Sequence, residues 1–518
     1  MLPPVAGPRK LLYVLPPALI AATVVLSALA RRPGFTQGGL ASHDVGGILY
    51  NAMLLRSGGL PYVDSVEWKG PGSFYLAALF AGPHGTDIAA LQIAANCFGL
   101  ASLVLVAALA WRLWGPPAAV AAAAVCAIHD AHLDSMDANY VTWALLPQVA
   151  AVLLAVLADR RRRAEPVPSY RSLGTWLASG LLCAAATLCK QPDGVVLIPA
   201  LAHALFGGPR RDLRAGLAVL LGYLAGHAVV AAHYLAHGQL GAFVTSYAGF
   251  DWGFAYIGHH AGTPLGTAAW EGGAATLYFL ALPLLLAGFA LAARPRELAP
   301  ELRAQLRLLW IWVGAAMLAA AVGLRFYKGY FLGVLPPLCL LAAAPWGLLA
   351  PATWRARISW LAAPALALLV ARAGLQLQAT RVDRAQPHDD GARKIAAHIT
   401  KYSQPGKRIW VWGWHLWGVY AYAERLSASP LYKTPGLLTR FDDDTWRRPS
   451  TPMQLIPNSP HAARLLRDLA ADPPIFIALG GSVPREQFTA LRSFLADRYE
   501  LDRRARIGKV EIWRRRDP

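Results

Sequence analysis

Charged side chains are scarce along this chain. Only 15% of its 518 residues are Asp, Glu, Lys or Arg, whereas 56% are hydrophobic. A soluble protein of this length carries about a quarter charged residues. Charged residues are nearly absent from several windows of about 20 apolar residues, which are typical of helices that cross a membrane. The scarcity therefore excludes a wholly soluble globular protein and predicts a large membrane domain.

Cysteine is also rare, and sites for N-linked glycosylation are absent. The five cysteines lie in or beside apolar segments and none has the spacing of metal ligands, so we expect them to serve as packing residues. The sequence contains no Asn-x-Ser/Thr acceptor. Neither a cysteine metal site nor a glycosylated surface is predicted.

Acidic residues are outnumbered, with 30 Asp and Glu against 49 Lys and Arg, which gives a net charge of +19. Such a balance often indicates a nucleic-acid partner. Here the arginines cluster in short runs beside apolar segments, where basic residues set the orientation of membrane helices. We therefore predict contact with membrane lipids and no nucleic-acid partner.

Apolar windows predict a polytopic α-helical protein with about eleven transmembrane helices. The short segments at 116–129, 174–189 and 192–207 are rich in Ala and Gly. The predicted spans are 11–30, 86–111, 116–129, 140–158, 174–189, 192–207, 215–236, 273–293, 308–324, 330–350 and 357–374.

The distribution of arginine predicts a cytoplasmic N-terminus. With that orientation, the basic runs fall in cytoplasmic loops, whereas the opposite loop from 237 to 272 contains no Lys or Arg. The first apolar segment is longer than a usual signal-peptide core and is followed by two arginines, so we expect an uncleaved helix. The basic runs include RLWGPP, DRRRR (159–163), PRRDLR (209–214), RPRELAPELRAQLR (294–307) and WRAR (354–357).

The character of the sequence changes after residue 374. Charge rises, and the segments ARKIAAHITKYS, SPHAARLLRDLAAD and REQFTALRSFLADRY predict helices. RIWVWGW, PPIFIALGG and KVEIWRR predict strands. We therefore predict a transmembrane domain over 1–374 and an α/β domain over 375–518, and the loop parity places the second domain outside the cytoplasm.

Polar groups concentrate in the loops assigned to that same outer side. The first loop, SHDVGGILYNAMLLRSGGLPYVDSVEWKGPG (42–72), carries three carboxylates and Lys69, and the second reads HDAHLDSMDANY (129–140). An aromatic loop follows at 245–260, and RFYKGY lies at 325–330. Together these loops predict a site at the outer membrane surface.

Each of these groups also has a simpler interpretation. Asp44 is a suitable cap for an amphipathic interfacial helix over 45–55, and Lys69 can extend towards lipid headgroups. Asp64 and Glu67 can be solvated loop charges, and HDAHLDSMD can be a hydrated loop or an opportunistic metal site. Arg325 and Lys328 can be interfacial anchors.

The combined pattern resembles the polyprenyl-phosphate-sugar-dependent (GT-C) glycosyltransferases, a superfamily that includes protein O-mannosyltransferases and the lipid A aminoarabinose transferase. The resemblance lies in Asp44, the run Gly59-Leu60-Pro61-Tyr62, Asp64 or Glu67, and Lys69 ahead of an aromatic run. LCKQPDGVVLIP, KGYFLGVLPPLCLLAAA (328–344) and VWGWHLWGVYAYAERL (411–426) are similar to later landmarks of that group. The sequence departs from the group's pattern in having a single acid after His43 and a glycine between Lys69 and the proline.

The resemblance implies an inverting hexosyl or pentosyl transferase of the cell envelope. Its donor is a sugar on a polyprenyl phosphate, and its acceptor is a lipid, a glycan or a protein. The implied location is the bacterial inner membrane, with the active site and the C-terminal domain outside the cytoplasm. The aromatic loop and the outer domain are expected to frame the acceptor.

The resemblance also implies roles for individual residues. The catalytic carboxylates are Asp44 and Asp137, and Asp130 and Asp134 compete with Asp137. Metal use stays open, because Asp44 and Asp137 can also share a divalent cation with the phosphate. The donor phosphate is assigned to Lys69, Arg325, Lys328 and Tyr330, and contacts to the acceptor or a metal to His43, Asp64, Glu67, Asp130 and Asp134.

Three alternatives stay open. A transporter or flippase of lipid-linked sugars also has many spans, but it usually shows mid-membrane polar residues and an internal repeat, and no clear repeat is present here. A polysaccharide polymerase or ligase uses a pyrophosphate-linked donor instead. An interaction protein explains the outer domain but not the outward acids and lysines.

Overall fold

A computed structural model describes most of the chain, and the residues fall into two compact units. Unit 1 comprises 1–35, 95–230 and 264–385, and unit 2 comprises 36–94, 231–263 and 386–518. The described residues are 8–36, 39–40, 42–164, 170–208, 211–247, 249, 262–293, 299–348, 362–386, 388–441, 444–448, 452–505 and 507–516.

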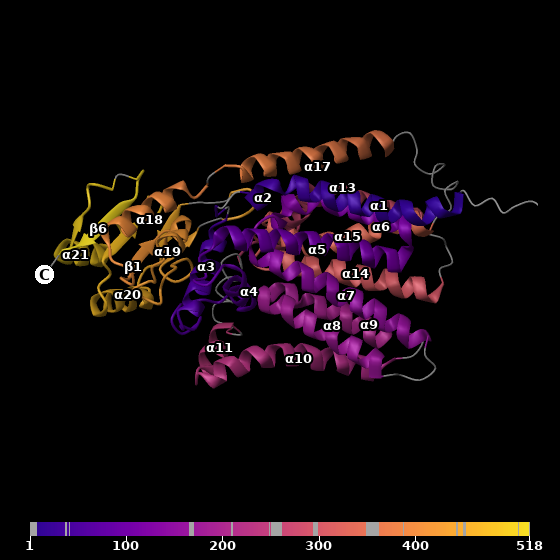
Figure 1. Cartoon of the computed structure of the whole chain (residues 1–518), viewed down its shortest axis with the longest axis horizontal. Coiled ribbons are helices and arrows are strands. Elements are labelled where there is room, and N and C mark those ends of the chain that lie inside the picture. The colour runs from indigo at the N-terminus through magenta and orange to yellow at the C-terminus, as the bar shows by residue number, and fades with distance from the viewer. Residues whose placement is uncertain are drawn as a thin grey trace, which may run out of the picture. The chain divides into compact units, whose positions relative to one another are not determined.

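Helices make up unit 1 (Figure 1). Each predicted span overlaps one of them. The α-helices that lie wholly or mainly in this unit are α1 (Pro8–Ala30), α2 (Arg32–Thr36), α5 (Ile88–Trp114), α6 (Pro116–His129), α7 (Tyr140–Ala164), α8 (Tyr170–Cys189), α9 (Leu197–Phe206), α10 (Leu213–Ala236), α13 (Leu265–Ala293), α14 (Pro300–Ala321), α15 (Leu335–Leu348) and α17 (Ala362–Arg384).

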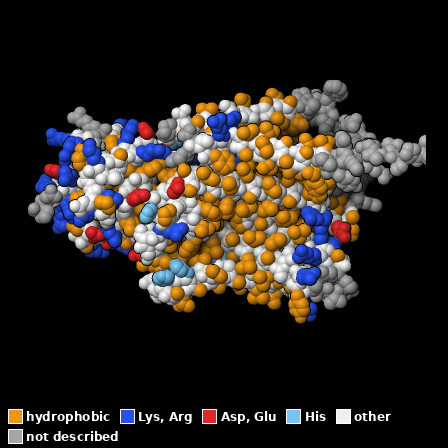
Figure 2. Space-filling model, in the orientation of Figure 1, with side chains coloured by type: hydrophobic (Ala, Val, Ile, Leu, Met, Phe, Trp, Pro, Cys, Tyr) orange, Lys and Arg blue, Asp and Glu red, His pale blue; other side chains and the backbone are white. Residues whose placement is uncertain are grey.

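Six of these helices are long and apolar enough to cross a membrane, by length and composition. They are α5, α7, α8, α10, α13 and α14, and three shorter apolar helices cover Leu15–Ala30, Pro116–His129 and Leu335–Gly347. Figure 2 shows hydrophobic side chains spread over the helices of unit 1, with few Lys and Arg among them. These features establish a multi-pass membrane protein.

One predicted span is shorter than expected. The range 192–207 forms a 3-10 turn, η2 (Gln191–Val196), followed by the ten-residue helix α9. At 1.5 Å per residue, α9 is about 15 Å long and covers only about half of a hydrocarbon core. The polar run Lys190-Gln191-Pro192-Asp193 favours the turn, because Pro192 cannot donate a backbone hydrogen bond inside a helix.

Small residues let two helices of unit 1 approach closely. A Cβ on Gly180 of α8 would lie 1.9 Å from the carbonyl oxygen of Val219 on α10, and a Cβ on Gly222 would lie 2.0 Å from that of Leu177. Only glycine fits at such crossings, as in other membrane helix pairs that pack through small residues. The Gly content of these segments therefore reflects helix packing.

Unit 2 is built around a four-stranded sheet in the order β1-β4-β6-β5. Strand β1 (Ile409–Trp412) pairs parallel with β4 (Phe476–Leu479). The other two pairs are antiparallel and join β6 (Glu511–Arg515) to β4 and to β5 (Tyr499–Leu501). The remaining elements are α3 (His43–Arg56), α4 (Gly72–Phe80), α11 (Leu240–Tyr247), α18 (Asp390–Tyr402), α19 (Gly418–Ala423), α20 (Pro460–Ala471), α21 (Thr489–Arg498), β2 (Thr439–Phe441) and β3 (Met453–Leu455).

Alternating side chains of β1 cover the two faces of that sheet. Ile409 and Val411 pack in one apolar cluster with α3, α18 and α19. Trp410 and Trp412 pack in another with α20 and α21. Because successive strand residues point to opposite faces, the run IWVW contributes to both cores, as expected for a buried strand between helical layers.

Helix α3 differs from the sequence-based expectation. Residues Val45 to Leu54 are all buried, whereas an interfacial amphipathic helix exposes one face. Tyr50 and Met53 belong to the same apolar cluster as α18 and α19. A Cβ on Gly46 would lie 2.7 Å from the backbone nitrogen of Gly418. The interfacial interpretation is wrong because unit 2 encloses this helix.

The two units also differ from the predicted ranges 1–374 and 375–518. Helix α17 continues to Arg384, and the residues of the first loop, 36–94, cluster with 386–518. The predicted helices and strands after 375 are all present. Three strands and the helix α19 were not predicted, since β2, β3 and β5 have three residues each and give no periodic signal.

Candidate active site

Asp44 lies in the first turn of α3. The helix begins at His43, and Ser42 is the N-cap residue. The interpretation of Asp44 as the cap is therefore wrong, although the positive end of the helix dipole still favours a carboxylate there. The ring of His43 packs edge-on against Trp414, with 3.9 Å between ring centroids. Asp44 is half-buried and held by regular secondary structure.

Glu67 is buried in unit 2, with 2% of its surface exposed. It forms an ion pair with Lys433 and accepts a 2.7 Å hydrogen bond from the Tyr432 hydroxyl. Burial by itself raises the pKa of the Glu67 carboxyl, but Lys433 and the donated hydrogen bonds outweigh it and hold the pKa below its ordinary value. Glu67 is therefore a buried anion, and its interpretation as a solvated loop charge is wrong.

Lys69 is half-buried and its backbone is held on both sides. Its amide donates to Glu67 Oε1 over 3.1 Å, and its carbonyl accepts a hydrogen bond from the Tyr62 hydroxyl. Tyr62 has a φ of +70°, which a bulky residue seldom adopts. Asp64, in contrast, is exposed and accepts from the Leu60 amide over 2.7 Å.

Lys433 is a cation of this group that was not predicted. Burial lowers the pKa of its ammonium, and the positive charge of Lys69 lowers it further, while the negative charges of Glu67 and Asp44 oppose the shift. Unit 2 therefore brings Asp44, Glu67, Lys69 and Lys433 within electrostatic range of one another. No motif in the sequence marks Lys433.

In unit 1, each acid of the second loop has its own basic partner. Asp130 pairs with Arg31 at 2.5 Å, Asp134 with Lys328 at 2.9 Å and Asp137 with Arg384 at 3.5 Å. The partners come from the turn residue directly after α1, from the turn η3 (Lys328–Phe331) and from α17. The sequence left these three acids as candidates for one role, and the structure distinguishes them by their different basic partners.

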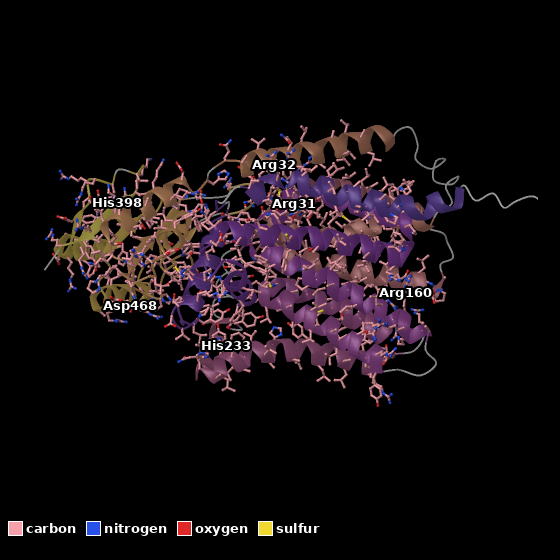
Figure 3. All side chains as sticks on the ribbon, in the orientation of Figure 1. Arg31, Arg32, Arg160, His233, His398 and Asp468 are labelled. Atoms are coloured by element: carbon pink, nitrogen blue, oxygen red, sulfur yellow. The ribbon has the colours of Figure 1, made fainter. Side chains whose placement is uncertain are left out.

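The contacts of Asp130 indicate a structural role. Arg31 has no exposed surface and also donates to the backbone carbonyl and side-chain oxygen of Ser135. These contacts tie α1 to the π-helical turn η1 (Ala131–Ser135), in which Asp134 has a φ of +70°. Figure 3 labels Arg31. Asp130 therefore shapes the loop that presents Asp134 and Asp137.

Two lysines lie at the turn η3. Lys190 lies 3.9 Å from Asp193 and 4.7 Å from the centre of the Tyr330 ring. The Asp134 carboxylate raises the pKa of Lys328, against a smaller effect of burial. A Cβ on Gly329 would lie 2.9 Å from Asp134 Oδ2, so glycine permits this approach.

Arg325 is half-buried just before η3. Lys190, Arg325, Lys328 and Arg384 are suited to a phosphate, because cations on separate elements can surround its oxygens. Lys190 lies in the motif LCKQPDGVVLIP, but no role was predicted for it. Arg384 is the last residue of α17 and lies in no motif. The sequence therefore signalled only part of this group.

The remaining predictions are distributed between the units. His43, Asp44, Asp64, Glu67 and Lys69 belong to unit 2, and Asp130, Asp134, Asp137, Arg325, Lys328 and Tyr330 belong to unit 1. Among the described residues, no group of three or more His, Cys, Asp or Glu is arranged to hold a metal ion. The aromatic loop at 245–260 lies outside the described residues except for 245–247 and 249.

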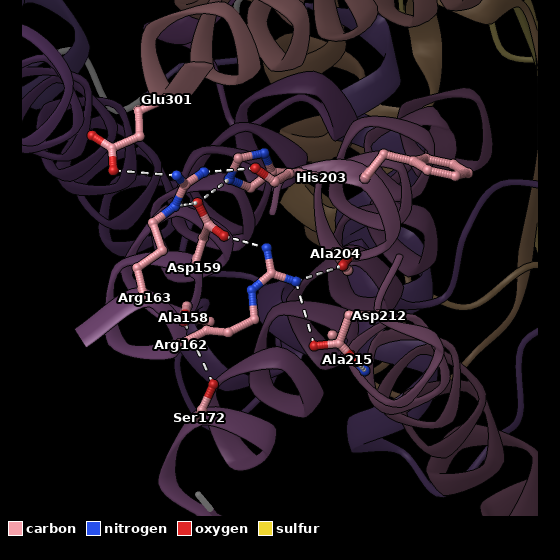
Figure 4. A network of polar contacts seen from close by, with 12 residues as sticks. Ala158, Asp159, Arg162, Arg163, Ser172, His203, Ala204, Asp212, Ala215 and Glu301 are labelled. Atoms are coloured by element: carbon pink, nitrogen blue, oxygen red, sulfur yellow. Dashed lines mark hydrogen bonds and ion pairs between the residues drawn. The ribbon is translucent and has the colours of Figure 1, made fainter. Parts of the chain in front are cut away.

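The far end of the unit 1 helices carries a separate ionic network (Figure 4). Asp159 contacts Arg162, Arg163 and His203. Arg162 also reaches Asp212, and Arg163 reaches Glu301. Figure 3 shows Arg160 and Arg31 near opposite ends of these helices. Arg162 and Arg163 therefore connect the end of α7 to the neighbouring residues Asp212 and Glu301.

Residues 68–235 match a family model described as dolichyl-phosphate-mannose-protein mannosyltransferase. Comparison of the sequence with curated proteins gives no match. The matched segment begins beside Lys69 and includes the second loop. It therefore covers part of both residue groups described above.

Solved structures with similar folds are known. ArnT from Cupriavidus metallidurans, bound to undecaprenyl phosphate, aligns with a TM-score of 0.59 and 14% identity over 95% of this chain and 97% of that protein. The apo oligosaccharyltransferase of Archaeoglobus fulgidus aligns at 0.54 and 14% identity, over 89% of this chain and 69% of that protein. The chain has the GT-C fold predicted from its motifs.

An oligosaccharyltransferase complex adds a further comparison. Archaeoglobus fulgidus AglB, in complex with an inhibitory peptide and a dolichol-phosphate, gives a TM-score of 0.52 at 13% identity. The alignment covers 89% of this chain and 69% of that protein. The same fold thus occurs in two structures that hold a polyprenyl-type phosphate.

Proposed function

We propose that this protein is a membrane glycosyltransferase that moves a sugar from a polyprenyl phosphate to a lipid, glycan or protein acceptor. The observation that carries the proposal is that unit 1, on a GT-C fold, supplies the basic residues Lys190, Arg325, Lys328 and Arg384, of which Lys328 pairs with Asp134 and Arg384 with Asp137. Such a group suits a phosphate leaving group. The family match and the polyprenyl phosphates held by similarly folded proteins support the same donor class.

The charged side chains assigned to the site suggest the following course for sugar transfer. The acceptor oxygen attacks the anomeric carbon, the bond from that carbon to the phosphate oxygen breaks, and the sugar inverts. Asp44 accepts the acceptor's proton or orients its hydroxyl, and Asp137 is the second carboxylate. Lys69, Arg325, Lys328 and Tyr330 stabilise the negative charge that develops on the departing polyprenyl phosphate.

We assign the remaining roles in the same way. Catalysis belongs to the membrane domain, 1–374, and the domain 375–518 frames the acceptor outside the cytoplasm of a bacterial inner membrane. We assign contacts to the acceptor or to a metal to His43, Asp64, Glu67, Asp130 and Asp134.

A donor assay tests the proposal. The purified protein is incubated in detergent or in vesicles with polyprenyl-phosphate-linked sugars, or with the corresponding pyrophosphates, and with lipid and protein acceptors. We expect transfer from the monophosphate donors only. Transfer from pyrophosphates alone indicates a polymerase or ligase instead, and transport across vesicles without transfer indicates a flippase.

Lysine variants sharpen this test. Lys69→Ala or Lys328→Ala removes a counter-charge from the phosphate and should weaken donor use by about 2–5 kcal/mol. Lys407→Ala, at an exposed position of unit 2, is the matched control and should behave as the wild type. Normal donor dependence in both site variants would remove those lysines from the site.

A further inference from the structure

A buried carboxylate organises the segment that carries Lys69. Glu67 Oε1 accepts hydrogen bonds from the backbone amides of Trp68, at 2.9 Å, and Lys69, at 3.1 Å. The same oxygen is paired with Lys433, and Oε2 accepts from Tyr432 at 2.7 Å. Two of these donors lie in the first loop and two lie more than 360 residues later, so one carboxylate joins the two segments.

The same contacts reach the helix that carries Asp44. Asn51 of α3 donates to the Tyr432 hydroxyl over 3.0 Å and accepts from Ser65 over 2.6 Å. A Cβ on Gly47 would lie 3.2 Å from that hydroxyl, so α3 passes close to Tyr432. The Val66 amide also donates to the Pro430 carbonyl at 2.8 Å. Residues 430–433 thus bind both α3 and the Lys69 segment.

The environment of Lys433 is unusual for a lysine. Its side chain is only 4% exposed, and its ammonium lies 3.8 Å from the centre of the Trp68 ring. Taking both charges of such a pair out of water costs much of what their attraction returns, so a buried ion pair is weak evidence for a role in stability. The hydrogen bonds that Glu67 accepts from the backbone amides of Trp68 and Lys69 give the pair a different use.

We propose that the Glu67–Lys433 pair, with Tyr62, is a positioning device that holds the Lys69 segment in the geometry needed for donor binding. Lys433 and Glu67 touch no donor atom in this scheme. They fix the Lys69 amide, while Tyr62 fixes its carbonyl. The inference rests on the proposed function, because it takes Lys69 to be a ligand of the donor phosphate.

Two double variants separate positioning from stability. Glu67→Met/Lys433→Met removes both charges and the acceptor for the Lys69 amide, whereas Glu67→Gln/Lys433→Met removes both charges but keeps an acceptor oxygen. Since neither leaves an unpaired buried charge, we expect both to fold with an unfolding temperature near that of the wild type. The probe is polyprenyl phosphate, whose binding is followed by tryptophan fluorescence.

The expected results differ between the variants. The Met/Met variant should bind polyprenyl phosphate roughly 10- to 100-fold more weakly, because a small displacement of a binding group has a large effect. The Gln/Met variant should stay within about threefold of the wild type. Tyr62→Phe, which removes only the hydroxyl, should weaken binding without lowering the unfolding temperature. This variant tests the proposal if the Met/Met variant does not fold.

A buried pair elsewhere in unit 2 gives the control. Asp502 contacts His398 at 2.9 Å, and Asp502→Asn should lower the unfolding temperature without altering the binding of polyprenyl phosphate. Equal binding by the wild type, Met/Met and Tyr62→Phe variants would overturn the positioning role. Absence of binding by the wild type would instead overturn the proposed function.

Discussion

Asp44 is the residue on which the proposed chemistry depends most. It occupies the first turn of α3, and the N-cap position belongs to Ser42. A role in capping is therefore removed, and the helix dipole alone gives the carboxylate less than about 1 kcal/mol of stabilisation at such a position. Asp44 is thus placed as a fixed, half-buried carboxylate whose identity matters more for reactivity than for folding.

Asp44→Asn tests this assignment. Asparagine keeps the size and hydrogen-bonding capacity of aspartate but cannot accept a proton, so we expect transfer to fall by roughly 100-fold or more in a folded, membrane-inserted protein. Sugar transfer by the purified variant is the measurement. Asp87→Asn is the matched control, because Asp87 caps α5 by accepting from the Ala90 amide at 2.9 Å. Near wild-type transfer by Asp44→Asn would contradict the assignment and move the role to Asp64, Glu67 or Asp137.

The pH dependence of stability tests the Glu67 ion pair. Since the pKa of Glu67 in the folded protein lies below its ordinary value of 4.5, its stabilising effect is present above about pH 4.5 and is lost as the pH falls through the folded pKa. Glu67→Gln leaves Lys433 buried without its counter-charge at every pH. We expect the unfolding temperature of this variant to lie below that of the wild type near pH 7.

The two unfolding temperatures should then converge on acidification. Below the folded pKa, the protonated Glu67 of the wild type resembles the glutamine of the variant. Thermal unfolding in detergent between about pH 3 and pH 7 measures both curves. A difference that is the same at all pH values would contradict an ionised Glu67.

At this scale, the sequence marks residues that stand in motifs better than their distant ion-pair partners. Asp44, Lys69 and Lys328 stand in motifs, and their residue types suggest their chemistry. Arg31, Arg384 and Lys433 carry no motif, and they meet Asp130, Asp137 and Glu67 only through tertiary contacts. Pairing across hundreds of residues leaves no local pattern, which is why these partners could not be predicted.

Among the elements, the turn η1 shows how a loop acquires its shape. It follows α6, contains a residue with positive φ and is held by Arg31 from the end of α1. The polar run HDAHLDSMD predicted a hydrated loop or a metal site. The structure instead buries Asp130 against Arg31, so that the loop is fixed by an ion pair and presents Asp134 and Asp137.

Arg31→Met tests this role of the ion pair. The substitution leaves Asp130 buried without its partner, and we expect the free energy of unfolding to fall by about 3–5 kcal/mol. The neighbouring Arg32 is exposed, so Arg32→Gln should stay within about 0.5 kcal/mol of the wild type. Thermal unfolding of the purified proteins in detergent is the measurement.

The double variant Arg31→Met/Asp130→Leu supplies the complementary result. It removes both charges, and much of the lost stability should return. An Arg31→Met protein as stable as Arg32→Gln would show that the pair does not hold η1.

The helices and strands illustrate which elements a sequence reveals. Long apolar runs such as α5 and α13 were predicted because their composition alone marks them. The amphipathic pattern of α18 and α20 predicted those helices in the same way. Helix α3 was assigned to the wrong environment, since its burial depends on α19 and on Tyr432, which lie far away in the sequence.

At the scale of the whole molecule, the GT-C fold was predictable and the grouping of segments was not. Hydropathy indicates spans, and the loop motifs indicate the superfamily. The clustering of 36–94 with 386–518 arises from contacts such as Glu67 with Lys433 and Asp389 with the Leu40 amide. Such contacts join segments with different hydropathy, so a boundary drawn from composition at residue 375 separates them.

The orientation of the whole chain in the membrane gives the last prediction. Basic residues are retained on the cytoplasmic side of membrane proteins, and Arg160, Arg161, Arg162 and Arg163 follow one another at the end of α7. A reporter that is active only in the cytoplasm should therefore be active when fused after Ala164 and silent when fused after Pro518. Enzyme activity in intact cells, normalised to the amount of fusion protein, is the measurement. Activity of the Pro518 fusion equal to that of the Ala164 fusion would reverse the loop assignments, and with them the placement of Asp44 and Lys69 at the outer surface.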